Sequence, residues 1–379
     1  MPDESGLTMR YAFYQIGTSA IATNAFARRV GIDAVALPSP NMDTIARGVS
    51  LSPEFSCFPF KVLLGLLMQG IDRGANVFVV PVSRSISSCQ LADFGMAQKY
   101  ILARTGHEVD IVLLDTVRPD RVLESFRKYN KDVTLMHVSE GLVVAAQKLL
   151  LLEGVEDGYR DIYLAARKQK AEAYRSRWMR EIDGTDSILD LHALGRRMGE
   201  DRGRYAKADV GSLLKIAVIG DIYSINEKII NNNIFERLCD LNVFSENGIK
   251  LRMLFGTGIH SAPEDPALSG KAREYLRHNI GGFALDTVKS AIRFAERGYD
   301  GLLHIYPFSC MPEVVVRTIL PGIGADYDVP VLNLPIDEQT GDAGFTTRVE
   351  AFVDLIGIRR SRRPGTPNRS MRTKRGNGS

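Results

Sequence analysis

The chain has 379 residues, of which 45% are hydrophobic and 25% charged, as in ordinary globular proteins. Its length suggests two domains, and its four cysteines are too few for a disulfide framework. The net charge is only +3, no apolar run reaches the roughly 18 residues of a membrane span, and no secretory signal opens the chain, so we expect a cytoplasmic protein without a membrane segment.

The first part of the chain alternates short apolar runs with amphipathic stretches, which is typical of parallel α/β folds. Runs this continuously apolar indicate strands that are buried on both sheet faces. The expected strands are 11–17, 32–38, 76–83 and 109–116. The expected helices are 20–30, 60–74, 92–105 and 120–130.

Residues 137–210 are charged, rich in Ala and without strand signals, which indicates long amphipathic helices that bridge two domains. A second α/β unit follows. Its expected strands are 211–221, 249–256, 300–307 and 329–337. Its expected helices are 231–241, 283–297, 313–320 and 346–357.

The last 21 residues carry eight Arg or Lys and no acid, which leaves the rest of the chain at −5. We predict a solvated, disordered basic tail and no nucleic-acid partner. The predicted fold is therefore α/β, with two Rossmann-like (flavodoxin-like) parallel-sheet domains linked by a helical segment. The predicted boundaries are 1–136, 137–210 and 211–358, with the tail at 359–379.

Three cysteines occupy comparable places. Cys57 lies in "SPEFSCFPFKVLLG", a loop that feeds a helix, whereas Cys89 and Cys310 follow the strands at 76–83 and 300–307. Ligands of open α/β sheets bind beyond the carboxyl ends of strands, so two facing crevices would bring the three sulfurs together. Nearby prolines would stiffen these loops, and a helix starting after each thiolate would present backbone N–H groups and a positive dipole end.

Three thiolates from separate loops suit a [4Fe–4S] cluster with one iron open to substrate. They are one short of a closed zinc site, and no His lies at a ligand-like spacing. Zinc, redox chemistry and simple burial remain open for these three residues. Cys239 shares a helical apolar stripe with Phe235 and Leu238, so we expect it to pack.

The segments "SPEFSCFPFKVLLG", "GDIYSINEKIINNNIFERL" and "GYDGLLHIYPFSCMPEVVVRTILP" resemble the 2-hydroxyacyl-CoA dehydratase superfamily, as does "VPVLNLPIDEQTGDAGFTTRVEAFVDLI". The similar branch is the C-terminal part of CoA-substrate-specific enzyme activases. The resemblance covers residues 10–358 and implies an iron–sulfur cluster between α/β domains, held here by Cys57, Cys89 and Cys310. The cluster would be [4Fe–4S] or a larger double-cubane type.

Dehydratases of this family take one electron from a separate ATP-dependent activator of the actin-like ATPase fold and pass it to an acyl-CoA thioester. The resemblance therefore implies such an activator as partner, an acyl-CoA or small-molecule substrate, and a homo- or heterodimer. This chain has no phosphate loop, so we do not expect it to hydrolyse ATP. Its "GGFALDT" segment lacks the His of the family's corresponding element, which leaves the substrate open.

Polar residues near the expected strand ends are further candidates. Glu313 lies in the first turn after Cys310, where a carboxylate either pairs with the helix dipole or transfers protons. Glu338 is the second catalytic candidate. Tyr223, Asn226, Glu227 and Arg348 are the candidates for substrate binding.

Two nearby residues are expected to be structural. Thr346 would cap its helix, and His304 would be a hydrogen-bonded core residue.

Two other functions remain open. A cluster-carrying relay or scaffold for the activator would bind no acyl-CoA. A cluster-free α/β protein would use its cysteines only for packing.

Overall fold

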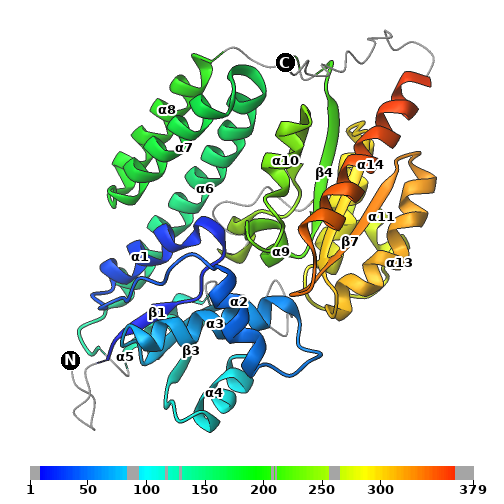
Figure 1. The fold of residues 1–379 in the computed structure, drawn as a ribbon. Coiled ribbons are helices and arrows are strands. Elements are labelled where there is room, and N and C mark those ends of the chain that lie inside the picture. Colours follow the sequence, from blue (N-terminus) through cyan, green and yellow to red (C-terminus); the bar gives the residue numbers. More distant parts are fainter. Residues whose placement is uncertain are drawn as a thin grey trace, which may run out of the picture.

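The computed structural model shows two parallel sheets joined by a helical segment (Figure 1), the fold class expected from the sequence. It describes residues 9–82, 94–115, 118–127, 130–205, 209, 211–255 and 265–362. The strands are β1 (Tyr11–Phe13), β2 (Val77–Val82), β3 (Asp110–Asp115), β4 (Leu214–Gly220), β5 (Val243–Asn247), β6 (Gly301–Pro307) and β7 (Val331–Ile336).

The helices of the N-terminal half are α1 (Ala20–Arg29), α2 (Met42–Leu51), α3 (Phe58–Asp72), α4 (Phe94–Arg104) and α5 (Pro119–Arg127). Those of the helical segment are α6 (Leu135–Ala166), α7 (Lys168–Asp183) and α8 (Ile188–Gly203). The C-terminal half contains α9 (Ile222–Asn226), α10 (Ile234–Asp240), α11 (Pro266–Tyr275), α12 (Ala284–Glu296), α13 (Met311–Asp326) and α14 (Asp342–Arg362). Two short 3₁₀ helices are η1 (Gly17–Ser19) and η2 (Leu251–Phe255).

The first sheet has the strand order β1-β2-β3 with parallel pairing throughout. The expected strand at 32–38 was wrong, because this segment makes only one bridge, between Ala34 and Tyr11 on the outer side of β1. Pro38 is the last residue of this segment and Pro40 follows it, and proline cannot donate to a ladder. The segment thus occupies the place of a second strand without extending the sheet.

The second sheet has the order β5-β4-β6-β7, also parallel. The expected strand at 249–256 was wrong, because residues 251–255 form η2 and the second strand of the unit is β5. The Asn247 side chain accepts a hydrogen bond from the Ile249 backbone N–H at 2.9 Å. Such an Asx turn diverts the chain, so the strand ends before the apolar run begins.

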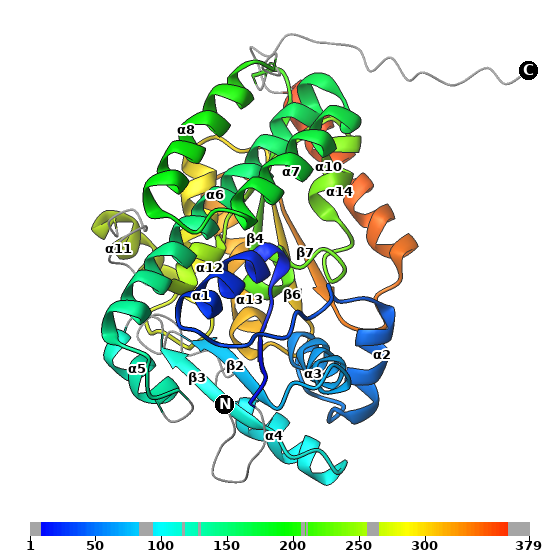
Figure 2. The same ribbon diagram turned by 90° about the vertical axis from the view of Figure 1, so that its left-hand side faces the viewer.

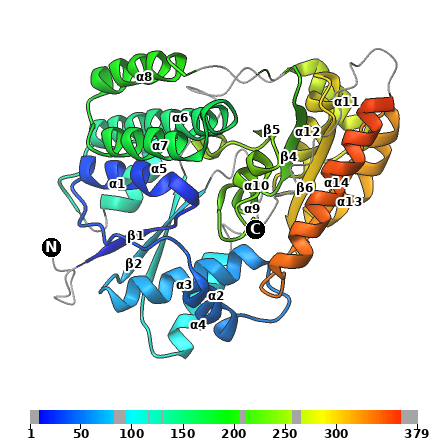
Figure 3. The same ribbon diagram turned by 45° about the horizontal axis from the view of Figure 1, so that its top comes forward.

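Helices cover both faces of the second sheet (Figures 1 and 3). One face packs on α12 and α13, around Val288, Ile292 and Val316. The other packs on α14, whose Phe352 and Ile356 belong to the large core cluster that also includes residues of the first sheet. The two halves of the protein therefore share one continuous core.

The helical segment has a core of its own around Trp178, which is fully buried. Its longest helix, α6, also packs against α1 and α5 of the first half and against η2 and β5 of the second. Figures 1 and 2 show α1 and α6 side by side. Residues 137–210 thus do more than connect two sheets, because α6 packs against elements of both halves.

Helix α6 has a length and composition that would allow it to cross a membrane, and no other helix of the described residues does. Within its most apolar window, however, 56% is buried inside the protein. Over this part of its length α6 packs as a core helix, because its side chains contact other helices.

Three further differences concern local signals. Helices α2 and α11 were not expected, although Asn41 caps α2 in a reciprocal capping box with Thr44. The expected cap at Thr346 was wrong, because α14 begins at Asp342 and Thr346 lies inside it. The expected disorder of the tail from residue 359 was also wrong for residues 359–362, which belong to α14. Arg360 donates hydrogen bonds to the Gly211 carbonyl at 2.6 Å and to Asp300 at 3.2 Å. Residues 363–379 lie outside the described part.

Candidate functional site

The order of the second sheet reverses between β4 and β6, which makes their carboxyl ends a topological switch point where α/β proteins bind ligands. Gly220 ends β4 with φ +131°, and a Cβ there would lie 2.0 Å from the Ile305 carbonyl oxygen. Only glycine fits this close approach. The chain then enters α9 through Asp221, and β6 leads to Cys310.

Cys310 and Cys57 both occupy the N-cap position of a helix, of α13 and α3 respectively. Each helix has proline in its first turn, Pro312 and Pro59, and both cysteines are half-buried. The predicted local setting is thus confirmed for these two residues. Backbone N–H groups at a helix start favour a negatively charged ligand such as a thiolate.

A salt bridge joins the start of α3 to the segment that follows β7. Lys61 lies one turn beyond Cys57, with its backbone N–H 3.3 Å from the Cys57 carbonyl oxygen, and its Nζ forms an ion pair with Glu338. Glu338 follows β7, the neighbour of β6, and the Phe308 backbone N–H donates to the Ile336 carbonyl at 2.9 Å. Cys57 and Cys310 therefore lie on the same junction between the two halves.

Cys89 lies outside the described residues, so its predicted convergence with the other two sulfurs stays a prediction. Strand β2, which precedes it, ends at Val82 in the centre of the first sheet. Among the residues that the structure describes, no three His, Cys, Asp or Glu side chains form a group that could hold a metal. A three-cysteine site would need the third sulfur from this segment.

Glu313 lies in the first turn of α13, as predicted, but faces the protein interior. It is 1% exposed, its Oε2 lies 2.9 Å from His304 Nε2, and it accepts a hydrogen bond from the Thr287 hydroxyl at 3.0 Å. His304 is completely buried and its Nδ1 lies 2.7 Å from Asn333 Oδ1, so the predicted core histidine is confirmed. This network ties α12 and α13 to β6, which fits a supporting role for Glu313.

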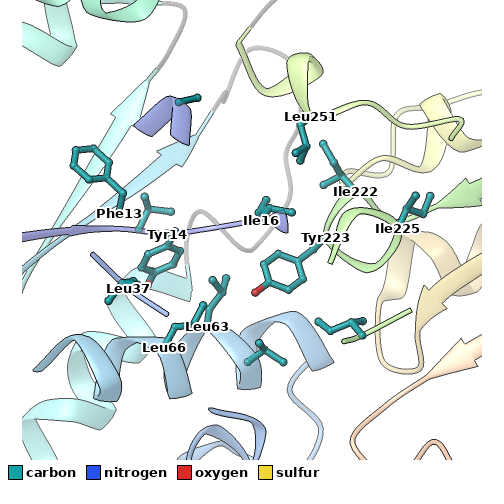
Figure 4. Packing of buried hydrophobic residues seen from close by; sticks show 14 of the residues in the cluster. Phe13, Tyr14, Ile16, Leu37, Leu63, Leu66, Ile222, Tyr223, Ile225 and Leu251 are labelled. Carbon is teal, nitrogen blue, oxygen red and sulfur yellow. The ribbon is translucent and has the colours of Figure 1, made fainter. Parts of the chain in front are cut away.

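Tyr223 follows the switch point but does not reach solvent. It is fully buried, and its hydroxyl points across the junction toward Leu63 of α3 and the Tyr14 side of the first half (Figure 4). Within the described part of the chain the hydroxyl has no hydrogen-bond partner, and burial raises its pKa well above the ordinary value. The Tyr14 hydroxyl, in contrast, donates to Gln98 Oε1.

Asn226 and Glu227 line a cavity of about 540 Å³ where both halves and the helical segment meet, here called the interdomain cavity. Glu227 accepts a hydrogen bond from the Gly17 backbone N–H at 2.9 Å, and burial raises its pKa. Gly17 has φ +53°, and a Cβ there would lie 2.4 Å from the Asn226 carbonyl oxygen. Arg160 and Arg175 extend into the lining from α6 and α7, so this cavity carries charges of both signs.

The other candidate residues named from the sequence make contacts within the protein fold. Arg348 is exposed and donates to the Asn333 carbonyl at 2.9 Å, and Thr346 accepts a hydrogen bond from Arg237 at 2.6 Å. Cys239 is 5% exposed, and burial raises its thiol pKa to about 12, so its predicted packing role is confirmed.

The sequence reasoning missed Lys61 and the cavity-lining side chains of α6 and α7. Lys61 is the lone charge in the apolar stretch "FPFKVLLGLL", and that isolation was the available signal. Comparison with protein-family models and with curated proteins found no match.

Proposed function

We propose that the chain is an iron–sulfur protein of the 2-hydroxyacyl-CoA dehydratase type, which receives low-potential electrons from an ATP-dependent activator in the cytoplasm. The observation that supports this best is the pair of N-cap cysteines, Cys57 and Cys310, at one interdomain junction. Cys89 would supply the third thiolate from the segment after β2. Thiolates from separate loops are the usual protein ligands of such clusters.

The residues around the two sulfurs suit an anionic group of this kind. The starts of α3 and α13 direct backbone N–H groups and positive dipole ends toward the junction. Lys61 adds a buried cation one turn from Cys57, balanced by Glu338. When bound, the cluster would supply one-electron reduction of a substrate at an iron without a protein ligand.

The interdomain cavity is the place that a small substrate would occupy. Its volume of about 540 Å³ lies in the range of small-molecule sites. Asn226 and Glu227 shape one wall, and both are held by hydrogen bonds, Asn226 to Ile249 and Glu227 to Gly17. The buried ring of Tyr223 fills the space beside α3 and keeps water out of the junction. A cavity of this size favours a protein that binds a small molecule over a pure electron relay, although neither Cys57 nor Cys310 is among its described lining residues.

The test is anaerobic purification and reconstitution of the full chain, with iron and sulfide analysis and EPR. We expect about four irons per chain for a cubane. Alanine variants of Cys57, Cys89 and Cys310 should each lose most of the iron, whereas Cys239→Ala should keep it. Iron well below about one per chain in the reconstituted wild type, or equal iron in all four variants, would contradict the proposal.

A second measurement separates enzyme from relay. Acyl-CoA esters added to the reconstituted protein should change the EPR spectrum of an enzyme, because the substrate approaches the cluster. A relay would show no change at any ester concentration.

A further inference from the structure

A second cavity borders the edge strand β5 and is strongly basic. It measures about 260 Å³ and lies between α6, α8, β5 and α12. We call it the basic cavity. Among the described residues, its lining contains six cationic side chains, those of Arg160, Arg202, Lys250, Arg252, Arg293 and Arg297. The lining acids are Asp157, Asp161 and Glu246, half as many.

The carboxylates pair with five of the six cations. Asp157 serves Arg160 and Lys250, and Glu246 binds Arg297 at 2.9 Å. Asp161 pairs with Arg202, and Glu153, outside this lining, binds Arg252 at 2.9 Å. Arg293 forms no ion pair with a carboxylate of the described residues, and its guanidinium donates to the Ser290 hydroxyl at 3.1 Å.

Arg293 and Arg297 also approach the same aromatic ring. Their Cζ atoms lie 5.9 Å and 5.3 Å from the centroid of the Phe294 ring. Burial and the positive charge of Arg297 lower the pKa of Arg293, and a bound anion would stabilise its charged form.

A buried hydroxyl on the lining gives an independent observation. Ser245 of β5 is 1% exposed, and its Oγ has no hydrogen-bond partner among the described residues. Buried polar atoms in folded proteins are nearly always hydrogen-bonded, so an orphan at a cavity wall indicates a missing acceptor or donor. An anionic oxygen would accept a hydrogen bond from the Ser245 hydroxyl.

We propose that the basic cavity binds a phosphate or diphosphate group. Arginine forks match the oxygens of such groups bidentately, and several charges are needed to hold a multiply charged anion. The basic and interdomain cavities share Asp157, Arg160, Asn247 and Lys250. A phosphorylated organic molecule can therefore place its phosphate in the basic cavity and its body in the interdomain cavity. The proposed anion site does not depend on the iron–sulfur proposal, because neither Cys57 nor Cys310 lines the basic cavity.

The experiment is isothermal titration of the full-length chain at low salt with inorganic phosphate, pyrophosphate and adenosine diphosphate. Adenosine is the unphosphorylated control. Arg293→Gln should weaken pyrophosphate binding about tenfold, and Ser245→Ala about threefold. Arg273→Gln removes an exposed arginine of α11 outside both cavities, with the same change in net charge, and should leave binding unchanged.

Three results would overturn the assignment. They are no pyrophosphate binding by the wild type at millimolar concentration, unchanged binding by Arg293→Gln, or equal weakening by Arg273→Gln. If adenosine diphosphate binds at least tenfold more tightly than pyrophosphate, the ligand is a phosphorylated organic molecule. Equal affinities assign the site to the free inorganic anion. These variants should leave the iron content unchanged, so the anion test and the cluster test can fail independently.

Discussion

The Lys61–Glu338 ion pair is the sharpest test of how the two halves are joined. Lys61 lies in the first half and Glu338 in the second, 277 positions apart along the chain. The Lys61 side chain is 5% exposed and that of Glu338 19%. Removing one partner of such a pair leaves the other charge desolvated and uncompensated.

We expect Glu338→Gln to lower the free energy of unfolding by about 3 kcal/mol, since the buried ammonium then keeps only a neutral acceptor. Lys61→Met should cost less, about 1–2 kcal/mol, because Glu338 is partly exposed and water can solvate its carboxylate. The double variant should cost less than the sum, with a coupling energy of about 2 kcal/mol. Methionine fills the volume of the lysine stem, so packing changes little.

Equilibrium urea unfolding measures these values, with far-UV circular dichroism as one probe and fluorescence of Trp178, the single tryptophan, as the other. The two transitions must coincide for one free energy to be meaningful. Asp72→Asn, which breaks the exposed Arg47–Asp72 ion pair, is the control and should have a much smaller effect. Single-variant costs that simply add, within about 0.5 kcal/mol, would refute an energetic link between the halves at this pair.

The sequence predicted those strands whose signal is local. Strands β2, β4 and β6 are central and buried on both faces, so their apolar runs stand out. Strand β5, with the sequence VFSEN, is an edge strand in which three polar residues follow only two apolar ones, and it was missed. The strand was predicted at the apolar stretch 249–256 instead. Ile249 and Leu251 of this stretch do pack into the core, but the described residues of the stretch include η2 and no strand.

The predictions for the candidate site also held where the signal was local and failed where tertiary packing decides. The positions of Cys57 and Cys310 follow from local features, an apolar strand or a helix start beside proline, and both predictions hold. Tyr223 was expected at an open crevice, but the first half of the protein covers it. Both cavities depend on side chains of α6, whose sequence contains no motif. Tertiary packing alone brings these side chains together.

Two further predictions concern buried polar groups at the switch point. Tyr223→Phe should leave the free energy of unfolding unchanged or raise it by up to about 1 kcal/mol, because it removes a buried hydroxyl that has no partner among the described residues. Thermal or urea unfolding measures this value. A lower free energy of unfolding in the variant would show that the hydroxyl does have a partner. Burial raises the pKa of Asp221 from its ordinary 3.8 to about 6, so the folded state binds this proton more tightly than the unfolded state. The resulting stability is fully present below about pH 4 and is lost as the pH rises through about 6, about 3 kcal/mol in all. Asp221→Asn keeps an acceptor for the Ser224 N–H but cannot ionise, so its unfolding free energy relative to wild type should rise by that amount between pH 4 and 7. Asp265→Asn, at the exposed cap of α11, controls for the loss of a capping carboxylate. A constant difference between Asp221→Asn and wild type across this range would mean that Asp221 is ionised in the folded protein at acidic pH, and that water reaches the switch point.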